Sequence, residues 1–146
     1  MVTEDQSTCS CHVRIRSDPA ELAEVRQRVS EVAAAAGFDE KEVSDIILAV
    51  DEALANVIRH GYGGPCEKPI DIHVDRSTAD GLECLTVSIR DFGKQFDPCS
   101  IAGRPLEKVR PGGLGIHIMK SVMDEVSYAP ADGGGMVLHM TKTRSR

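Results

Sequence analysis

The sequence lacks the features that would send a chain out of the cytoplasm or into a membrane. Its first residues contain neither the basic nor the apolar stretch of a secretion signal. The longest apolar run, near residues 46–50, is far too short to span a bilayer. No internal repeat or low-complexity segment is present. We therefore expect one cytoplasmic domain over residues 1–146, with a core at about 12–141.

An excess of positive charge is also missing. The net charge is −6, which argues against a general surface for nucleic acid or anionic membranes, because both attract basic patches. The five cysteines have no repeated spacing, so we expect reduced thiols. Cys9, Cys11 and His12 are too few for a structural zinc site, which needs four ligands at workable spacing.

Several common nucleotide-binding signatures are absent. There is no G-x-x-x-x-G-K-[ST] loop, which excludes a Walker-type site. Asp91-Phe92-Gly93 is shared with eukaryotic-type protein kinases, but the chain lacks their other motifs and is too short for that fold. The glycines at 112–115 follow an irregular stretch instead of a strand, which argues against a Rossmann site.

Hydrophobic periodicity predicts an α+β fold. Asp18 and Asp39 each precede a helical pattern and have Glu three residues later, the pattern of a capping box. The elements do not alternate as βαβ units, so we expect two layers, with about three helices on one face of a mixed, mostly antiparallel sheet. Residues 94–112 are irregular and are expected to form a lid. The predicted strands are 12–16, 70–74, 85–89, 126–128 and 136–140, and the predicted helices are 18–37, 39–61 and 113–123.

A polar stripe lies opposite the apolar stripe of the second predicted helix. At 100° per residue, Glu52, Asn56, Arg59 and His60 share one face. Such a stripe alone is most simply a solvent-exposed face, but Leu48 and three alanines flank it, and asparagine is a mediocre helix former. An amide oxygen suits Mg²⁺. Glu52, one turn before Asn56, could orient or deprotonate a hydroxyl that approaches a phosphate.

Asp91 and the later glycines supply two further polar features. Asp91 continues the alternation of the strand before it, so its carboxylate should point to the buried face, where it needs a donor. The amino group of adenine would serve, as would N–H groups of its own turn. Gly112, Gly113 and Gly115 open the third helix, where free N–H groups favour a phosphate.

Taken together, three motifs in this order resemble the N, G1 and G2 boxes of the GHKL (Bergerat-fold) ATPases. They are Glu52-x-x-x-Asn56-x-x-Arg59-His60-Gly61-Tyr62, the segment 91–98, and the glycine-rich segment 112–116. Segments 91–98 and 110–128 are especially similar to the anti-sigma-factor serine/threonine kinases of bacterial partner-switching systems. The resemblance covers residues 12 to about 141.

This resemblance implies a cytoplasmic, homodimeric kinase that uses ATP and Mg²⁺. Such a kinase binds a sigma factor and phosphorylates a serine or threonine of a STAS-domain anti-anti-sigma protein. Asn56 would hold Mg²⁺, Glu52 would be the catalytic base, Asp91 would read adenine, and residues 94–112 would form the ATP lid. The other implied nucleotide-binding positions are Arg59, His60, Gly93, Phe96, Arg110, Gly112, Gly113, Leu114, Gly115 and Ile116.

Two other functions remain open on the sequence. One is a non-catalytic ATP-binding regulator that changes shape without transferring phosphate, which the presence of both Glu52 and Asn56 disfavours only mildly. The other is a histidine kinase, whose N box is similar. That class needs a helical domain bearing the phosphorylated histidine, and His12, the one histidine before the ATP-binding core, lies in a predicted strand.

Overall fold

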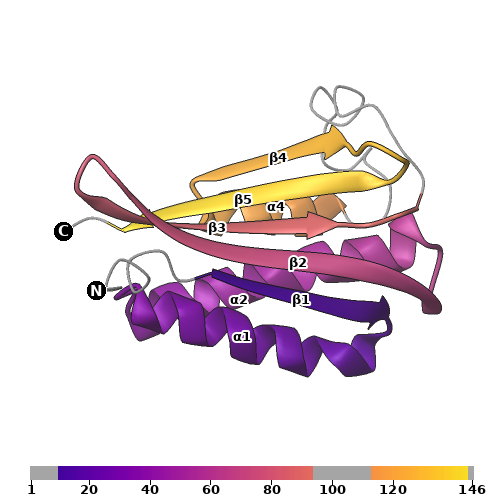
Figure 1. The fold of residues 1–146 in the computed structure, drawn as a ribbon, viewed down its shortest axis with the longest axis horizontal. Helices are drawn as coiled ribbons and strands as arrows, with labels where there is room; N and C mark the ends of the chain where they lie inside the picture. Colours follow the sequence, from indigo (N-terminus) through magenta and orange to yellow (C-terminus); the bar gives the residue numbers. More distant parts are fainter. Residues whose placement is uncertain (1–9, 94–112, 145–146) are drawn as a thin grey trace, which may run out of the picture.

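A computed structural model describes residues 10–93 and 113–144 of the chain. In this part, five strands form one antiparallel sheet in the order β1-β2-β3-β5-β4, and the helices cover one of its faces (Figure 1). The predicted α+β class is confirmed, and the predicted lid lies outside the described residues. The strands are Ser10–Ser17 (β1), Cys66–Ala79 (β2), Leu82–Arg90 (β3), Glu125–Pro130 (β4) and Met136–Arg144 (β5), and the helices are Leu22–Ala35 (α1), Glu40–Asn56 (α2) and Gly113–Val122 (α4).

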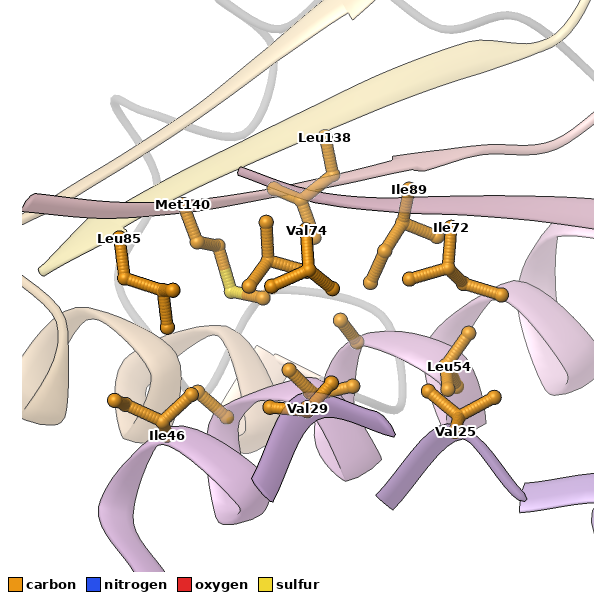
Figure 2. Close-up of a cluster of buried hydrophobic side chains, with 14 of the residues drawn as sticks. Val25, Val29, Ile46, Leu54, Ile72, Val74, Leu85, Ile89, Leu138 and Met140 are labelled. Carbon is orange, nitrogen blue, oxygen red and sulfur yellow. The ribbon is translucent and has the colours of Figure 1, made fainter. Parts of the chain in front are cut away.

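The hydrophobic core lies between the sheet and the helices. Alternate residues of each central strand face the helices, and Figure 2 shows side chains from β2, β3 and β5 meeting those of α1 and α2. Burial of these aliphatic side chains is the main source of stability. The opposite face of the sheet is polar, and one row across it consists of His12, His73, Ser88 and His139 on neighbouring strands.

The two predicted capping boxes have different outcomes. At α2 the box is present, since Glu42 N donates to Asp39 Oδ1 at 2.8 Å and Asp39 N donates to Glu42 Oε1 at 2.9 Å. At the first helix it is wrong. Asp18 instead caps a short 3₁₀ turn, Pro19–Glu21 (η2), and Glu21 accepts hydrogen bonds from the backbone and guanidinium of Arg16. The nearby cation gives Glu21 a stronger partner than the N-cap amide.

The second helix departs from its predicted course after Asn56. Sequence spacing predicts a helix to Gly61, but α2 ends at Asn56 and the chain continues as a π-turn, Val57–Gly61 (η3). Tyr62 N donates to Val57 O, five residues back, at 2.9 Å. The wider turn changes the rotation per residue, so the 100° spacing from which the polar stripe was predicted applies only as far as Asn56, the last residue of α2.

The surroundings of that stripe also differ from the prediction. Ala49 and Ala53, expected beside the stripe, belong to the core and are 0% and 1% exposed. Leu48 is 42% exposed. Helix α2 packs against both α1 and α4. The small side chains of these alanines suit a position between neighbouring elements.

Strands β2 and β3 are longer than predicted because the sequence analysis missed their turn. Asp80 and Gly81 both have positive φ, 54° and 79°, as a two-residue type I′ hairpin requires. The predicted hairpin between β4 and β5 is confirmed. Gly37, with a φ of 94°, follows the end of α1 as predicted.

Three cysteines fall in the described residues, and Cys11, Cys66 and Cys84 are all free thiols. Cys11 Sγ lies 3.3 Å from the Arg28 guanidinium, while the exposed ring of its neighbour His12 stacks on His73 at 4.2 Å on the polar face. Over residues 10–93 and 113–144, no three His, Cys, Asp or Glu side chains gather to hold a metal ion. Within the same ranges, no helix has the length and apolar character to cross a membrane.

Candidate nucleotide site

Asp91 lies at the end of β3 and is 6% exposed, so the predicted orientation toward the buried face is confirmed. Its Oδ1 accepts hydrogen bonds from Gly93 N at 2.9 Å and from Met136 N at 3.3 Å. The first bond is the contact with its own turn that the sequence left open. The second comes from β5 and was not predicted.

Both of these bonds reach the same oxygen of Asp91. Within the described part of the chain, none reaches Oδ2, which leaves an acceptor for an amino group from outside the protein. Burial raises the pKa of this carboxyl above its usual range, against the opposing effects of the two backbone N–H groups and of Arg90. A donor at Oδ2 would therefore stabilise the ionised form that burial disfavours.

The hairpin between β4 and β5 supports the Asp91 turn. The Arg90 guanidinium donates to the carbonyls of Asp91, Asp132 and Gly134 and lies 4.2 Å from the centre of the Phe92 ring. A Cβ at Gly135 would overlap the Asp91 carbonyl, so this position needs glycine. From the sequence, the glycines before β5 predict only a turn. Their unusual number, three in succession, was the available signal.

Asn56 is the last residue of α2, and its side-chain oxygen, unlike Asp91 Oδ1, has no hydrogen-bond donor among the described residues. Its Oδ1 is buried and accepts no hydrogen bond within the described residues. A buried amide oxygen without a donor is costly, and a bound cation would satisfy it. Mg²⁺ prefers oxygen ligands of this kind, so the observed side chain fits the predicted metal role.

Glu52 precedes Asn56 by one turn of the same helix and is partly exposed. Its neighbour Asp51 is paired with Arg26 at 3.0 Å. No ion pair engages Glu52 among the residues described. Of these two neighbouring carboxylates, Glu52 is therefore the one left available, among the described residues, for a group from outside the protein.

Tyr62 connects the end of the second helix to the Asp91 turn. Its hydroxyl donates to Pro69 O at 2.6 Å and accepts from Phe92 N at 2.7 Å. The fold therefore brings the N-box helix and the turn containing Asp91 together. Tyr62 ends the first of the three sequence motifs, but its role could not be predicted, because a contact across 30 residues leaves no local pattern.

The remaining predicted positions are described to different extents. Arg59 is exposed, and Gly93 is partly buried beside Asp91. His60 lies in η3, and Gly113 to Ile116 form the first turn of α4, but their side chains are outside the described part. The positions wholly outside the described residues are Phe96, Arg110 and Gly112.

The arrangement is that of the Bergerat fold of GHKL ATPases: helices on one face of an antiparallel sheet, a carboxylate after β3 and an amide on α2. Residues 15–142 match the family described as the histidine kinase-like ATPase domain. The chain belongs to this family, and the resemblance predicted from the three motifs is confirmed.

Two curated relatives place the chain more narrowly among the partner-switching kinases. The chain is 30% identical over 132 residues to the serine-protein kinase RsbW of Halalkalibacterium halodurans, covering 84% of this chain and 75% of that protein. It is 33% identical over 106 residues to the anti-sigma F factor of a Thermoanaerobacter species, covering 70% and 71% of the two chains.

Solved structures show the same fold. The RsbU and RsbW domains of Rv1364c from Mycobacterium tuberculosis superpose with a TM-score of 0.62 at 20% identity, over 94% of this chain and 33% of that one. A chain of the SiaB–SiaC complex from Pseudomonas aeruginosa gives 0.61 at 11% identity, over 97% and 92% of the two chains. At these identities the likeness concerns the fold.

Proposed function

We propose that the protein is an ATP- and Mg²⁺-dependent serine/threonine kinase that acts as an anti-sigma factor. In this proposal it phosphorylates a STAS-domain anti-anti-sigma protein and works as a cytoplasmic homodimer that also binds a sigma factor. The observation that carries the proposal is a pair on α2: among the described residues, the buried Asn56 oxygen has no donor, and Glu52, one turn earlier, has no ion-pair partner. The kinase and anti-sigma names of the relatives support the same activity.

Each residue of the site has a proposed role. Asn56 holds Mg²⁺, which when bound supplies positive charge beside the phosphates. Asp91 accepts a hydrogen bond from the adenine amino group through Oδ2, and Gly93 keeps the carboxylate oriented through its N–H. The proposed nucleotide contacts also include Arg59, His60, Phe96, Arg110 and residues 112–116.

Glu52 has the catalytic role in this proposal. Its carboxylate orients the serine or threonine hydroxyl of the partner and accepts its proton as the hydroxyl oxygen attacks the γ-phosphorus. The bond from that phosphorus to the bridging oxygen of ADP breaks in line with the attack. The N-terminus of α4 offers free N–H groups to the negative charge on the phosphates.

A transfer assay tests this function. The purified protein is incubated with Mg²⁺, γ-labelled ATP and STAS-domain proteins from its own genome, and label on one serine or threonine is expected. Glu52→Gln should bind ATP normally but transfer about 10²- to 10⁴-fold more slowly, the usual contribution of a general base. Asn56→Ala should abolish the label. Glu40→Gln, an exposed position at the start of the same helix, is the matched control and should behave as wild type.

Other results would change the conclusion. Unchanged transfer in Glu52→Gln would remove Glu52 as the base. Tight ATP binding without transfer to any partner would favour the non-catalytic regulator. Failure of the wild-type protein to bind ATP would contradict the nucleotide site itself.

A further inference from the structure

The turn after β3 is fixed by three backbone N–H groups, each of which donates a hydrogen bond. Asp91 N donates to Met136 O on β5 at 3.0 Å, and Gly93 N donates to the Asp91 side chain at 2.9 Å. Between them, Phe92 N donates to the Tyr62 hydroxyl at 2.7 Å. The first two bonds involve the backbone of β5 or Asp91 itself. The bond to Tyr62 depends on a side chain from another element, so one substitution removes it without changing Asp91.

Tyr62 is itself held at both ends. Its backbone N–H closes the π-turn by donating to Val57 O at 2.9 Å. Its hydroxyl hydrogen is directed to Pro69 O at 2.6 Å, which leaves the oxygen as the acceptor for Phe92 N. Burial raises the pKa of Tyr62, so the hydroxyl keeps that hydrogen at neutral pH. Lys68 Nζ lies 5.7 Å from the centre of its ring.

We propose that Tyr62 is a positioning residue for base recognition, whose hydroxyl holds the Asp91–Gly93 turn so that Asp91 Oδ2 faces the amino group of the base. The ligand class that follows is a purine nucleotide with an exocyclic amino group where adenine has it. This role rests on the proposed function, in which Asp91 receives the base. Tyr62 touches no reacting atom and acts through Phe92 and Asp91.

Two nucleotides and two variants test this role. Binding of ATP is compared with binding of the triphosphate of purine riboside, which lacks the 6-amino group. Tyr62→Phe should weaken ATP binding about tenfold, the effect of losing one well-placed hydrogen bond, and should leave the analogue nearly unchanged. Tyr128→Phe, at the other tyrosine of the chain, controls for loss of a hydroxyl and should keep the wild-type preference.

Each alternative result overturns the proposal. If the role of Tyr62 is purely structural, Tyr62→Phe weakens the binding of both nucleotides equally. Unchanged ATP affinity in Tyr62→Phe would show that the hydroxyl does not position the turn. Either result leaves the proposed kinase function intact. Wild-type protein that does not bind ATP would overturn that function and the role of Tyr62 together.

A measurement on the wild-type protein replaces the variant if Tyr62→Phe does not fold. Hydrogen exchange of the Phe92 amide should be as slow as that of the amides within β3, because this N–H group donates a hydrogen bond to the Tyr62 hydroxyl in the folded protein. Exchange at the rate of exposed loops would show that the bond to Tyr62 does not persist. That result would overturn the proposal without any substitution.

Discussion

The proposed base end of the site, at Asp91, and its proposed metal end, at Asn56, are built differently. Asp91 receives two backbone hydrogen bonds, and the turn around it is tied to β5, to the hairpin before β5 and to Tyr62. Asn56 Oδ1 is also buried, but no donor within the described residues reaches it. The base end is therefore part of the folded framework, whereas we propose that the Asn56 oxygen, unsatisfied among the described residues, gains its partner when a ligand binds.

This comparison predicts opposite effects of substitution at the two ends. Changes at the base end should lower the free energy of unfolding and nucleotide affinity together, since the same contacts serve both. Changes at the metal end should lower affinity while leaving the unliganded protein as stable as before, or more so. Loss of function and loss of stability are therefore coupled at one end and separate at the other.

The largest effect is expected at Gly135, in the base end. A Cβ here would overlap the Asp91 carbonyl, and the φ of 79° disfavours other residues. Gly135→Ala should lower the free energy of unfolding by about 3 kcal/mol or more and weaken ATP binding, measured by urea unfolding and titration. Gly134→Ala is the matched control, because its φ is 105° but its Cβ would meet nothing within 4 Å. Equal effects at both positions would mean that the close approach to Asp91 is unimportant.

A smaller effect of opposite sign is expected at Asn56. Without ligand, Asn56→Ala should raise the free energy of unfolding by about 1 kcal/mol, because it removes an unsatisfied buried group and improves helix propensity. The variant should also lose the Mg²⁺ dependence of ATP affinity. Ser44→Ala, an exposed position on the same helix, measures the propensity gain alone. Destabilisation by Asn56→Ala would show that the amide is already satisfied in the free protein.

The last effect is the dependence of nucleoside affinity on pH. Burial raises the pKa of Asp91, and a base amino group bonded to Oδ2 would lower it again. Adenosine affinity should therefore be constant above the raised pKa and fall as the pH drops through it, by up to about tenfold per pH unit. Adenosine carries no titrating phosphate, and Asp91→Asn should remove this slope. A slope that persists in Asp91→Asn would assign it to another group.

The same pKa shift acts on the unliganded fold with a definite sign. A carboxyl whose pKa is higher in the folded protein than in the unfolded chain stabilises the fold fully below its unfolded pKa. That contribution disappears as the pH rises through the folded pKa. The melting temperature of wild type relative to Asp91→Asn should accordingly rise toward acidic pH.

Local patterns predicted the parts of the fold that local physics determines. The capping box of Asp39 and Glu42 and the burial of Asp91 depend on residues close in the sequence, and both are confirmed. The three-box resemblance identified the family because the order and spacing of the motifs carry more information than any one of them.

Several of the missed features depend on tertiary context, whereas the Asp80–Gly81 turn was a local signal. The bonds from Met136 to Asp91 and from Phe92 to Tyr62 join residues 45 and 30 positions apart, which no periodicity reveals. The π-turn follows a sequence that reads as ordinary helix, so its extra residue becomes visible only in the backbone bond to Val57. At Asp18, the neighbouring Arg16 changed the partner of Glu21.

The π-turn also has a consequence at the level of the gene. Loss of a single codon within Val57–Gly61 would leave enough residues for an ordinary helical turn, so α2 and Asn56 would remain in place. Because this wide turn holds one residue more than an ordinary helical turn, Tyr62 N would then bond four residues back, and the Tyr62 hydroxyl would still reach Phe92. The same deletion in an ordinary helical turn would rotate the next residues of the helix by about 100°, whereas here Asn56 and Asp91 would stay joined through Tyr62.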